Sequence, residues 1–345
     1  MGRAPYPSAR GWLAGLVVAL GVASVGSLAL GSVLLPPRAV LAALVGQAQD
    51  PLHHLLVYEL RLPRVLGALA VGAALGVAGL LLQTLLQNPL AGPGVLGISA
   101  GASLGVAFVV FAGGSSVAVA GGLWQSGARV GAAFVGAGAA TAGVVLLAAR
   151  VRDSVVLLIA GLMLGHLLGG LVGLWQYYSA PEKLKEYLVW SLGSLGGLQR
   201  TELPYLYLPI GVGLLGALAV ASPLNALVLG EAYGQTLGVP LRRVRIAVVA
   251  LTSLLTAAVT AFAGPIGFVG IAVPHLARAL YPHPDHYRLI PLCACLGALV
   301  VVVCDALAQA PGYATVLPLS IVTALVGAPV VVWVLLRKPL PPPGA

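Results

Sequence analysis

The sequence predicts an all-α protein that crosses a membrane about ten times. Of its 345 residues, 59% are hydrophobic and only 8% are charged, and the mean hydropathy is +1.02. A soluble domain carries about 25% charged residues, so this chain has too little charge to cover a surface in water. The composition excludes a soluble enzyme, a disordered chain and a nucleic-acid-binding protein, although the formal net charge is +9.

Glycine, proline and cysteine usage fits the same class of protein. The 46 glycines favour closely packed membrane helices, and the 25 prolines are expected at breaks and loop edges. Cys293, Cys295 and Cys304 lie in one apolar run, so they predict neither a disulfide framework nor a zinc site. At roughly 20 residues per span, the chain has no room for a large soluble domain. Residues 1–345 are therefore expected to form a single membrane domain.

The apolar runs place the spans along the chain. The first run, 11–35, follows Arg3 and Arg10 and exceeds the about 7–15 apolar residues of a signal peptide, so it is expected to be retained. A polar segment follows from Pro36 to Pro63. Further spans are expected at 64–86, 95–112, 130–149, 154–175, 204–221, 246–263, 266–280, 289–308 and 318–336. The stretch 177–203 fits this scheme least well.

The distribution of basic residues predicts the orientation. With the N-terminus inside, the inner segments carry eleven Lys and Arg residues and the outer segments carry seven. We therefore expect both termini in the cytoplasm. The inner residues are Arg3, Arg10, Arg150, Arg152, Arg242, Arg243, Arg245, Arg278, Arg288, Arg337 and Lys338, and the outer ones are Arg38, Arg61, Arg64, Arg129, Lys183, Lys185 and Arg200.

A short pattern occurs twice. Ala91-Gly92-Pro93 leads into Leu96-Gly97-Ile98, and Ala263-Gly264-Pro265 leads into Val269-Gly270-Ile271. Five predicted spans separate the copies, so they fall on opposite membrane faces, as in an inverted-topology repeat. Chance similarity in a glycine-rich chain explains the pattern equally well.

Motifs for energy conversion are missing from the sequence. It contains no G-x-x-x-x-G-K-[ST] loop and no H-E-x-x-H, and no metal site is expected. Charged or titratable groups in the interior of the predicted spans are scarce, with Asp305 and His166 as the ones singled out, whereas ion-coupled transporters normally place several at mid-membrane. These observations favour a transport subunit that is not an enzyme and is driven by a partner.

Three segments carry a family resemblance over about residues 55–337. They are Arg61-Leu62-Pro63-Arg64 with Asn88-Pro89-Leu90-Ala91 and LGISAGA; Gly230-Glu231-Ala232-Tyr233 with Leu237-Gly238-Val239; and Gly264-Pro265-Ile266-Gly267-Phe268-Val269-Gly270 with Pro274-His275-Leu276-Ala277-Arg278. This series resembles the permease family of type II ABC importers, which take up iron–siderophore complexes, haem and cobalamin.

The resemblance implies a homodimeric permease of the bacterial inner membrane with two kinds of partner. A cytoplasmic ABC ATPase subunit would use ATP and Mg, and a periplasmic substrate-binding protein would deliver the cargo. The permease itself would hold no covalently bound cofactor. The implied site residues are, for ATPase coupling within about 222–243, Gly230, Glu231, Ala232, Tyr233, Leu237 and Gly238; for docking of the binding protein, Arg61 and Arg64; and for structural breaks or gating, Asn88, Pro89, Gly264, Pro265 and Pro274.

The sequence departs from the family pattern at five positions and leaves several roles open. The residues that replace those usual in the family are Gln87, Gly92, Gln309, Leu319 and Ser320. Gln309 stands where an outer arginine is expected to contact the binding protein. The cargo is not specified, since all these cargoes share the motifs.

Four residues have competing interpretations. His53 and His54 fit either a haem relay or a solvated loop. His275 fits a metal or haem ligand or, more commonly for a lone histidine, a hydrogen bond to the backbone. Asp305 fits a functional carboxylate, a helix cap or a hydrogen bond to a neighbouring helix. For the whole chain, the alternatives are an ion-gradient-driven secondary transporter and a membrane scaffold without transport.

Overall fold

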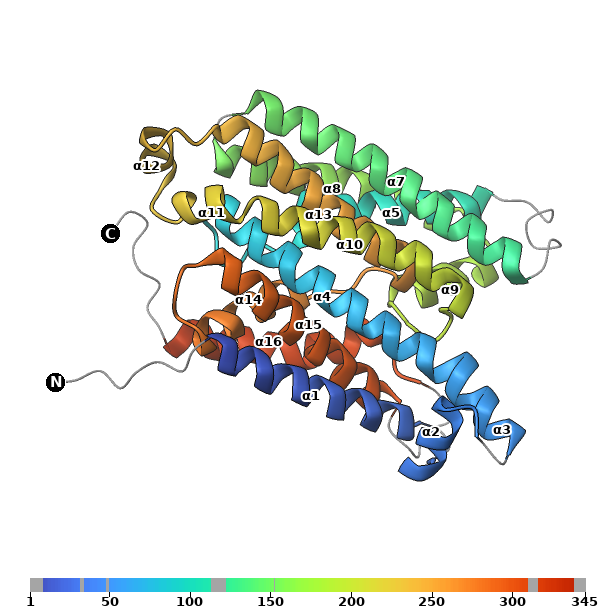
Figure 1. Ribbon diagram of the computed structural model, residues 1–345. Helices are drawn as coiled ribbons and strands as arrows, with labels where there is room; N and C mark the ends of the chain where they lie inside the picture. Colours follow the sequence, from blue (N-terminus) through green and yellow to red (C-terminus); the bar gives the residue numbers. More distant parts are fainter. Residues whose placement is uncertain are drawn as a thin grey trace.

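The computed structural model describes residues 9–31, 34–47, 50–112, 122–151, 153–309 and 316–337, and within these ranges the regular structure is helical with no strand. The long helices run side by side as one bundle (Figure 1). This confirms the all-α class. The helices are α1 Ala9–Ala29, α2 Pro37–Leu44, α3 Pro51–His54, η1 Leu55–Arg61, α4 Leu62–Leu85, η2 Pro93–Leu96, α5 Ile98–Ala107, η3 Phe108–Ala112, α7 Gly122–Arg150, α8 Ser154–Tyr177, α9 Pro181–Ser191, η4 Arg200–Glu202, α10 Leu203–Ala219, α11 Ala221–Leu227, α12 Glu231–Thr236, α13 Leu241–Ala263, α14 Val269–Leu280, α15 His286–Ala308 and α16 Leu319–Arg337.

Seven helices of the described chain are long and apolar enough to cross a membrane. They correspond to seven of the ten expected spans. The other three, at 95–112, 266–280 and 318–336, coincide with the shorter apolar helices Ile98–Ala112, Val269–Leu280 and Leu319–Trp333. The count of ten stays a prediction.

Two of the shorter helices are preceded by non-helical chain that lies inside the bundle. The turn η2 leads into α5, and a Cβ on Gly270 of α14 would overlap the ring of Pro93. Gly97, with φ +75°, packs against the backbone of Gly165 in α8. Non-helical backbone is tolerated at membrane depth only where protein buries it. The two similar Gly-Pro motifs thus contact each other, and the inverted repeat that they suggest stays a prediction.

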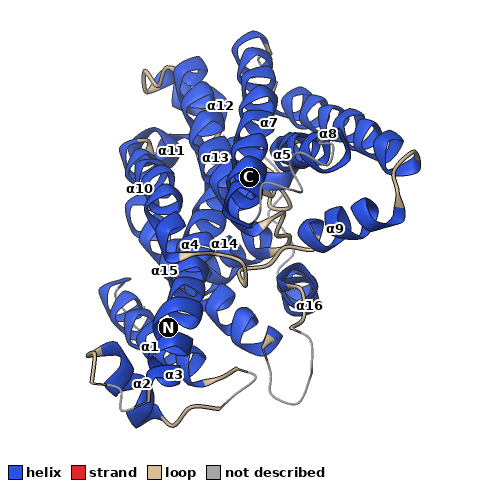
Figure 2. Ribbon diagram, turned by 90° about the vertical axis from the view of Figure 1, so that its right-hand side faces the viewer, coloured by secondary structure: helices blue, strands red, loops and turns tan. Residues whose placement is uncertain are grey.

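Helix α4 is the central element of the bundle. It packs against α15, α13, α14 and α10, which surround it when the molecule is viewed along the helices (Figure 2). A Cβ at Gly72 would overlap the carbonyl of Gly297, and one at Gly79 would overlap the backbone of Gly270. The glycines therefore permit the close helix packing expected from the composition. By contrast, few residues of α1 and α8 are fully buried within this chain.

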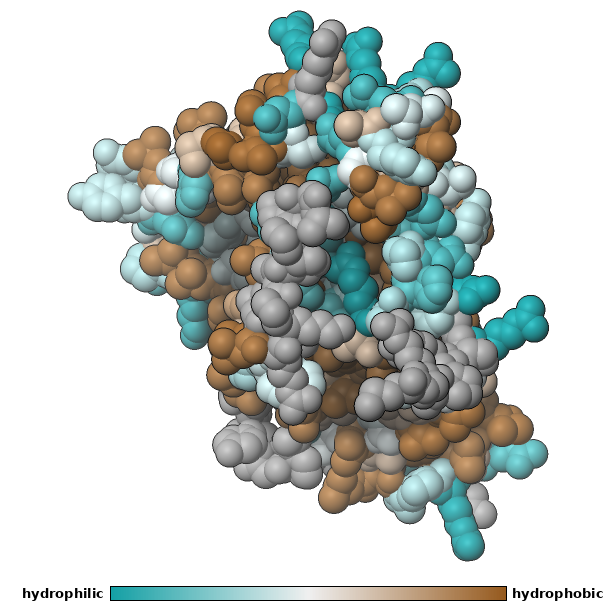
Figure 3. Space-filling view, turned by 90° about the vertical axis from the view of Figure 1, so that its left-hand side faces the viewer, coloured by the Kyte–Doolittle hydropathy of each residue, from teal (hydrophilic) through white to brown (hydrophobic). Residues whose placement is uncertain are grey.

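The bundle has two distinct ends. The first, called the α12 end, carries α11, α12, the last turn of α4 and the first turns of α8 and α13 (Figure 1). Hydrophilic side chains gather there (Figure 3). The opposite end, called the α9 end, carries α2, α3, α9 and the first turn of α4 (Figure 1). Arg3, Arg152 and Lys338, which contribute to the predicted orientation, lie outside the described residues.

Candidate coupling and docking surfaces

The predicted coupling segment forms two short helices at the α12 end. Gly230, with φ +104°, separates α11 from α12, and Gly238, with φ +79°, follows α12. A side chain would strain either backbone conformation, which accounts for glycine at both positions. Tyr233 and Leu237 are 49% and 58% exposed, and Ala232 is also exposed. These three residues form an outward face that a partner protein could contact.

Glu231 differs from the rest of this motif because it faces the bundle. Its Oε1 accepts hydrogen bonds from Ser154 Oγ at 2.9 Å and from Arg245 Nη2 at 3.0 Å. The side chain of Arg245 is 6% exposed, and its Nη1 donates to the carbonyl of Val151 at 2.8 Å. The carboxylate therefore joins α12 to the first turns of α8 and α13.

A second polar cluster fixes α11 to the bundle core. The Nδ1 of His286 lies 2.7 Å from Asn225 Oδ1, and its Nε2 lies 2.9 Å from Thr84 Oγ1. Gln87, one of the departures from the family pattern, donates from Nε2 to the carbonyl of Leu227 at 3.2 Å. The coupling segment thus contacts α4 and α15 directly.

The expected break residues occupy turns that other helices hold in place. Asn88 Oδ1 accepts a hydrogen bond from the amide of Leu90, which closes the turn after α4. The carbonyl of Pro89 lies 2.8 Å from His275 Nε2 on α14. His275 therefore makes the backbone hydrogen bond that was one of its two interpretations. Pro274, beside it, is buried inside α14.

Gly264 and Pro265 lie at the α9 end, where three segments distant in the sequence meet. Gly264 has φ +73°, and a Cβ there would lie 2.6 Å from the carbonyl of Trp190. The amide of Ser194 donates to the carbonyl of Ala263 at 2.9 Å, and Ser320 Oγ donates to the carbonyl of Pro265 at 2.6 Å. The segment after α9, the end of α13 and the start of α16 are thus locked together.

The two arginines expected to dock a binding protein both have partners inside the chain. Arg64 Nε and Nη2 donate to the carboxylate of Asp305 on α15 at 2.8–3.0 Å. Arg61 is 8% exposed and its Nη1 donates to the carbonyl of Leu28 at 2.7 Å, at the end of α1. Both side chains therefore join helices at the α9 end, and their docking role stays a prediction.

Asp305 and Gln309 belong to the same cluster. Asp305 is 0% exposed, and Gln309 Nε2 donates to its Oδ2 at 2.8 Å. Of the interpretations left open for Asp305, the hydrogen bond to a neighbouring helix is the one found. Gln309 takes part as a neutral donor, so this cluster contains one cation and one anion.

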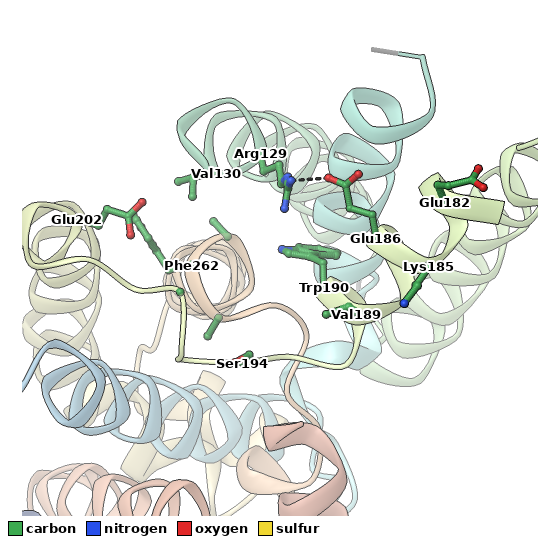
Figure 4. Close-up of a pocket in the computed structure, with 13 residues that line it drawn as sticks. Arg129, Val130, Glu182, Lys185, Glu186, Val189, Trp190, Ser194, Glu202 and Phe262 are labelled. Atoms are coloured by element: carbon green, nitrogen blue, oxygen red, sulfur yellow. Dashed lines mark hydrogen bonds and ion pairs between the residues drawn. The ribbon is translucent and has the colours of Figure 1, made fainter. Parts of the chain in front are cut away.

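A pocket of about 520 Å³ opens at the α9 end. Helices α7, α9 and α13 contribute Arg129, Glu186, Trp190 and Phe262 to its walls, and Glu202 lies opposite (Figure 4). Arg129 and Glu186 point toward each other and form an ion pair. Charged side chains line part of this pocket, and apolar side chains such as Val130, Val189 and Phe262 line the rest.

His53 and His54, at the end of α3, form no ligand cluster with the other described residues. His54 stacks on Tyr58, and His53 Nε2 lies 3.9 Å from an oxygen of Asp50. In the part of the chain that the structure describes, His, Cys, Asp and Glu form no group of three able to hold a metal ion.

A family model decides what kind of protein carries these surfaces. The model of the FecCD transport family matches residues 17–337. The chain belongs to the FecCD transport family. As a FecCD member it is a permease subunit of a type II ABC importer, a multi-pass protein of the bacterial inner membrane and not an enzyme. ATP hydrolysis lies in a partner subunit, and a substrate-binding partner completes such importers.

Curated FecCD relatives match along almost their whole length. The vitamin B12 import system permease protein BtuC of Klebsiella pneumoniae subsp. pneumoniae is 37% identical over 329 residues, which cover 95% of this chain and 94% of that protein. The protein of the same name from Escherichia coli O17:K52:H18 is 35% identical over 326 residues, covering 94% and 95%.

Solved structures share the fold. A metal-chelate type ABC transporter in an inward-facing conformation superposes with a TM-score of 0.82 at 30% identity, covering 94% of this chain and 99% of that chain. A chain of the PsaBC complex from Streptococcus pneumoniae gives a TM-score of 0.50 at 14% identity, covering 87% and 96%, and shows likeness of fold alone.

Sequence reasoning missed several residues of these surfaces. Glu231 lies 14 residues from Arg245 and 77 residues from Ser154 in the sequence. Arg64 and Asp305 are separated by 241 residues. Two features of the sequence pointed to these residues: the cluster of arginines that follows α12, and the lone carboxylate of the ninth expected span. Neither signal identifies its partner.

Proposed function

We propose that two copies of this permease form a homodimer that imports a bulky metal chelate, with cobalamin as the first candidate. The observation that carries this proposal is the 35–37% identity to vitamin B12 import permeases over 94–95% of the chain. Identity at this level leaves iron–siderophore complexes and haem as alternative cargoes, because the binding protein of an importer can select the cargo.

The α12 end is proposed to face the cytoplasm. It carries eight of the fifteen Lys and Arg residues of the described chain, and cytoplasmic segments of membrane proteins are enriched in these residues. Both termini would then be cytoplasmic. The exposed face of Ala232, Tyr233 and Leu237 would contact the ATPase subunit, which would use ATP and Mg, and the permease would hold no covalent cofactor.

The second copy is proposed to pack on the side that carries α8, α9 and α16 (Figure 2). Helices α8 and α16 expose large apolar side chains there, including Met163, Leu167 and Leu325. Beside them α9 exposes Glu182 and Lys185, which require water and are costly to place against lipid. A wet path between two apolar surfaces satisfies both requirements, so the cargo would pass along the dimer axis.

The binding protein would cover the α9 end. Gln309 brings no positive charge to this surface, and Arg64 is neutralised by Asp305. Electrostatic attraction between rim charges mainly raises the association rate. We therefore expect this docking to be less sensitive to salt than a surface with two unpaired arginines would be.

Uptake by reconstituted vesicles tests the cargo assignment. Liposomes would contain the permease and its ATPase, and the binding protein would be added outside with cobalamin, a ferric siderophore or haem in turn. The proposal predicts ATP-dependent accumulation of cobalamin. Accumulation of either other cargo, with none of cobalamin, would refute the cargo assignment.

A further inference from the structure

The first residue of α12, Glu231, has a side chain that is 32% exposed, yet its carboxylate binds groups of the bundle. Ala232, Tyr233 and Leu237 face outward, whereas Glu231 directs its carboxylate into the bundle toward Arg245. A carboxylate that only bound an ATPase would not need a buried arginine of its own chain. The geometry therefore separates Glu231 from the contact residues of its motif.

The contacts of Glu231 and Arg245 converge on one junction. Ser154, which donates to Glu231, is the first residue of α8. Arg245 also binds the carbonyl of Val151, just after α7 ends. Ser154 Oγ further lies 3.3 Å from the carbonyl of Leu85, the last residue of α4. The connection between α7 and α8 is thus held from both sides by a single ion pair.

The elements around this ion pair differ in how firmly they are held. Helix α12 lies between the glycine turns at Gly230 and Gly238. Its neighbour α11 is fixed to the core by the contact of Asn225 with His286. In α8, on the other side, 17% of the residues in the most apolar stretch are buried, against 83% in the span that contains α4. Within one copy of the chain, α8 is therefore held by fewer buried side chains than α4.

We propose that Glu231 and Arg245 are positioning residues that carry movement of α12 to the α7–α8 connection and the first turn of α8. The inference rests on the proposed function in one respect, that a partner ATPase moves α12. Coupling requires contacts that differ between two states. This ion pair joins the surface helix to the start of a helix proposed to line the path, so it can transmit such a difference.

Hydrogen exchange in the permease–ATPase complex tests the link without any cargo. The measurement compares amide exchange over residues 153–160 with and without a non-hydrolysable ATP analogue. Glu231→Gln keeps the shape of the side chain and removes its charge, and Arg245→Gln breaks the link from the other side. Arg150→Gln is the matched control, because Arg150 is exposed at the end of α7 near the same junction.

The wild type and the control should show a nucleotide-dependent change over residues 153–160. In both link variants this change should fall by at least about fivefold, the low end of measured allosteric couplings. The double variant should be no worse than either single variant, because the two residues act through one contact. Co-purification of the ATPase should be unchanged.

Three results would overturn the link. They are a wild-type nucleotide response in Glu231→Gln, the absence of any response at residues 153–160 in the wild type, and loss of ATPase binding in Glu231→Gln with the fold intact. The last result would make Glu231 an ATPase contact. A complex that responds to nucleotide as expected but imports no cobalamin would instead refute the proposed cargo and leave the link standing.

Discussion

Replacing Asp305 by asparagine should destabilise the protein more than any other carboxylate-to-amide substitution at the α9 end. Asp305 is 0% exposed on α15 and accepts three hydrogen bonds from Arg64 on α4, the central helix of the bundle. Asparagine keeps the size of the side chain and removes its charge. Arg64, whose side chain is 11% exposed, would then lack its counter-ion.

The magnitude follows from the burial of the pair. Removing one partner of a buried ion pair costs about 3–5 kcal/mol. An unfolding entropy of about 2.1 cal/mol/K per residue amounts to roughly 0.7 kcal/mol/K for this chain length. The midpoint of thermal unfolding should therefore fall by about 4–7 °C.

Thermal unfolding in detergent micelles, followed by size-exclusion chromatography of the soluble fraction, provides the assay. Glu186→Gln is the control, because the Arg129–Glu186 pair is about one-third exposed and should contribute no more than about 1 kcal/mol. The double variant Arg64→Met/Asp305→Leu should recover most of the loss, since apolar pairs often replace buried ion pairs without cost. An Asp305→Asn midpoint within about 1 °C of the wild type would refute the reasoning.

Four further predictions concern single positions. Gly79→Ala should cost about 1–3 kcal/mol, because its Cβ would overlap the backbone of α14, whereas Gly21→Ala, with open space around it, should not lower the thermal midpoint. Arg61→Met should speed amide exchange in the last turn of α1, because the carbonyls of that turn lose their donor. Tyr233→Asp should weaken co-purification of the ATPase without changing the thermal midpoint, since the side chain is 49% exposed. Gln309→Arg should raise the association rate of the binding protein at low salt, and an unchanged rate would argue against docking at this position.

Much of the fold could be predicted because its causes are local in the sequence. Lipid requires long apolar helices, and breaks such as Asn88-Pro89 and Gly264-Pro265 stand where the chain turns. Helices α11 and α12 form almost entirely within the predicted coupling segment 222–243, whose coupling role stays a prediction. The packing of the three shorter helices was harder to predict, because an apolar run in the sequence does not show that Pro93 packs against Gly270.

The partners of charged residues could not be predicted. Asp305 and Arg64 meet because α4 packs against α15, and nothing local to either residue indicates this. In the same way, the position of Glu231 in a motif suggested a contact with the ATPase, while the fold turns its carboxylate toward Arg245. Whether a charge serves a partner protein or the chain itself depends on the packing of distant helices.

The energy source of uptake tests the central claim most directly. Vesicles with the permease and its ATPase would be supplied with cobalamin-loaded binding protein, and uptake would be measured with ATP, without ATP and with ionophores that collapse ion gradients. A permease driven by a partner ATPase predicts uptake that requires ATP and persists with the ionophores. Uptake by the permease alone that the ionophores abolish would contradict the account and indicate an ion-gradient-driven carrier.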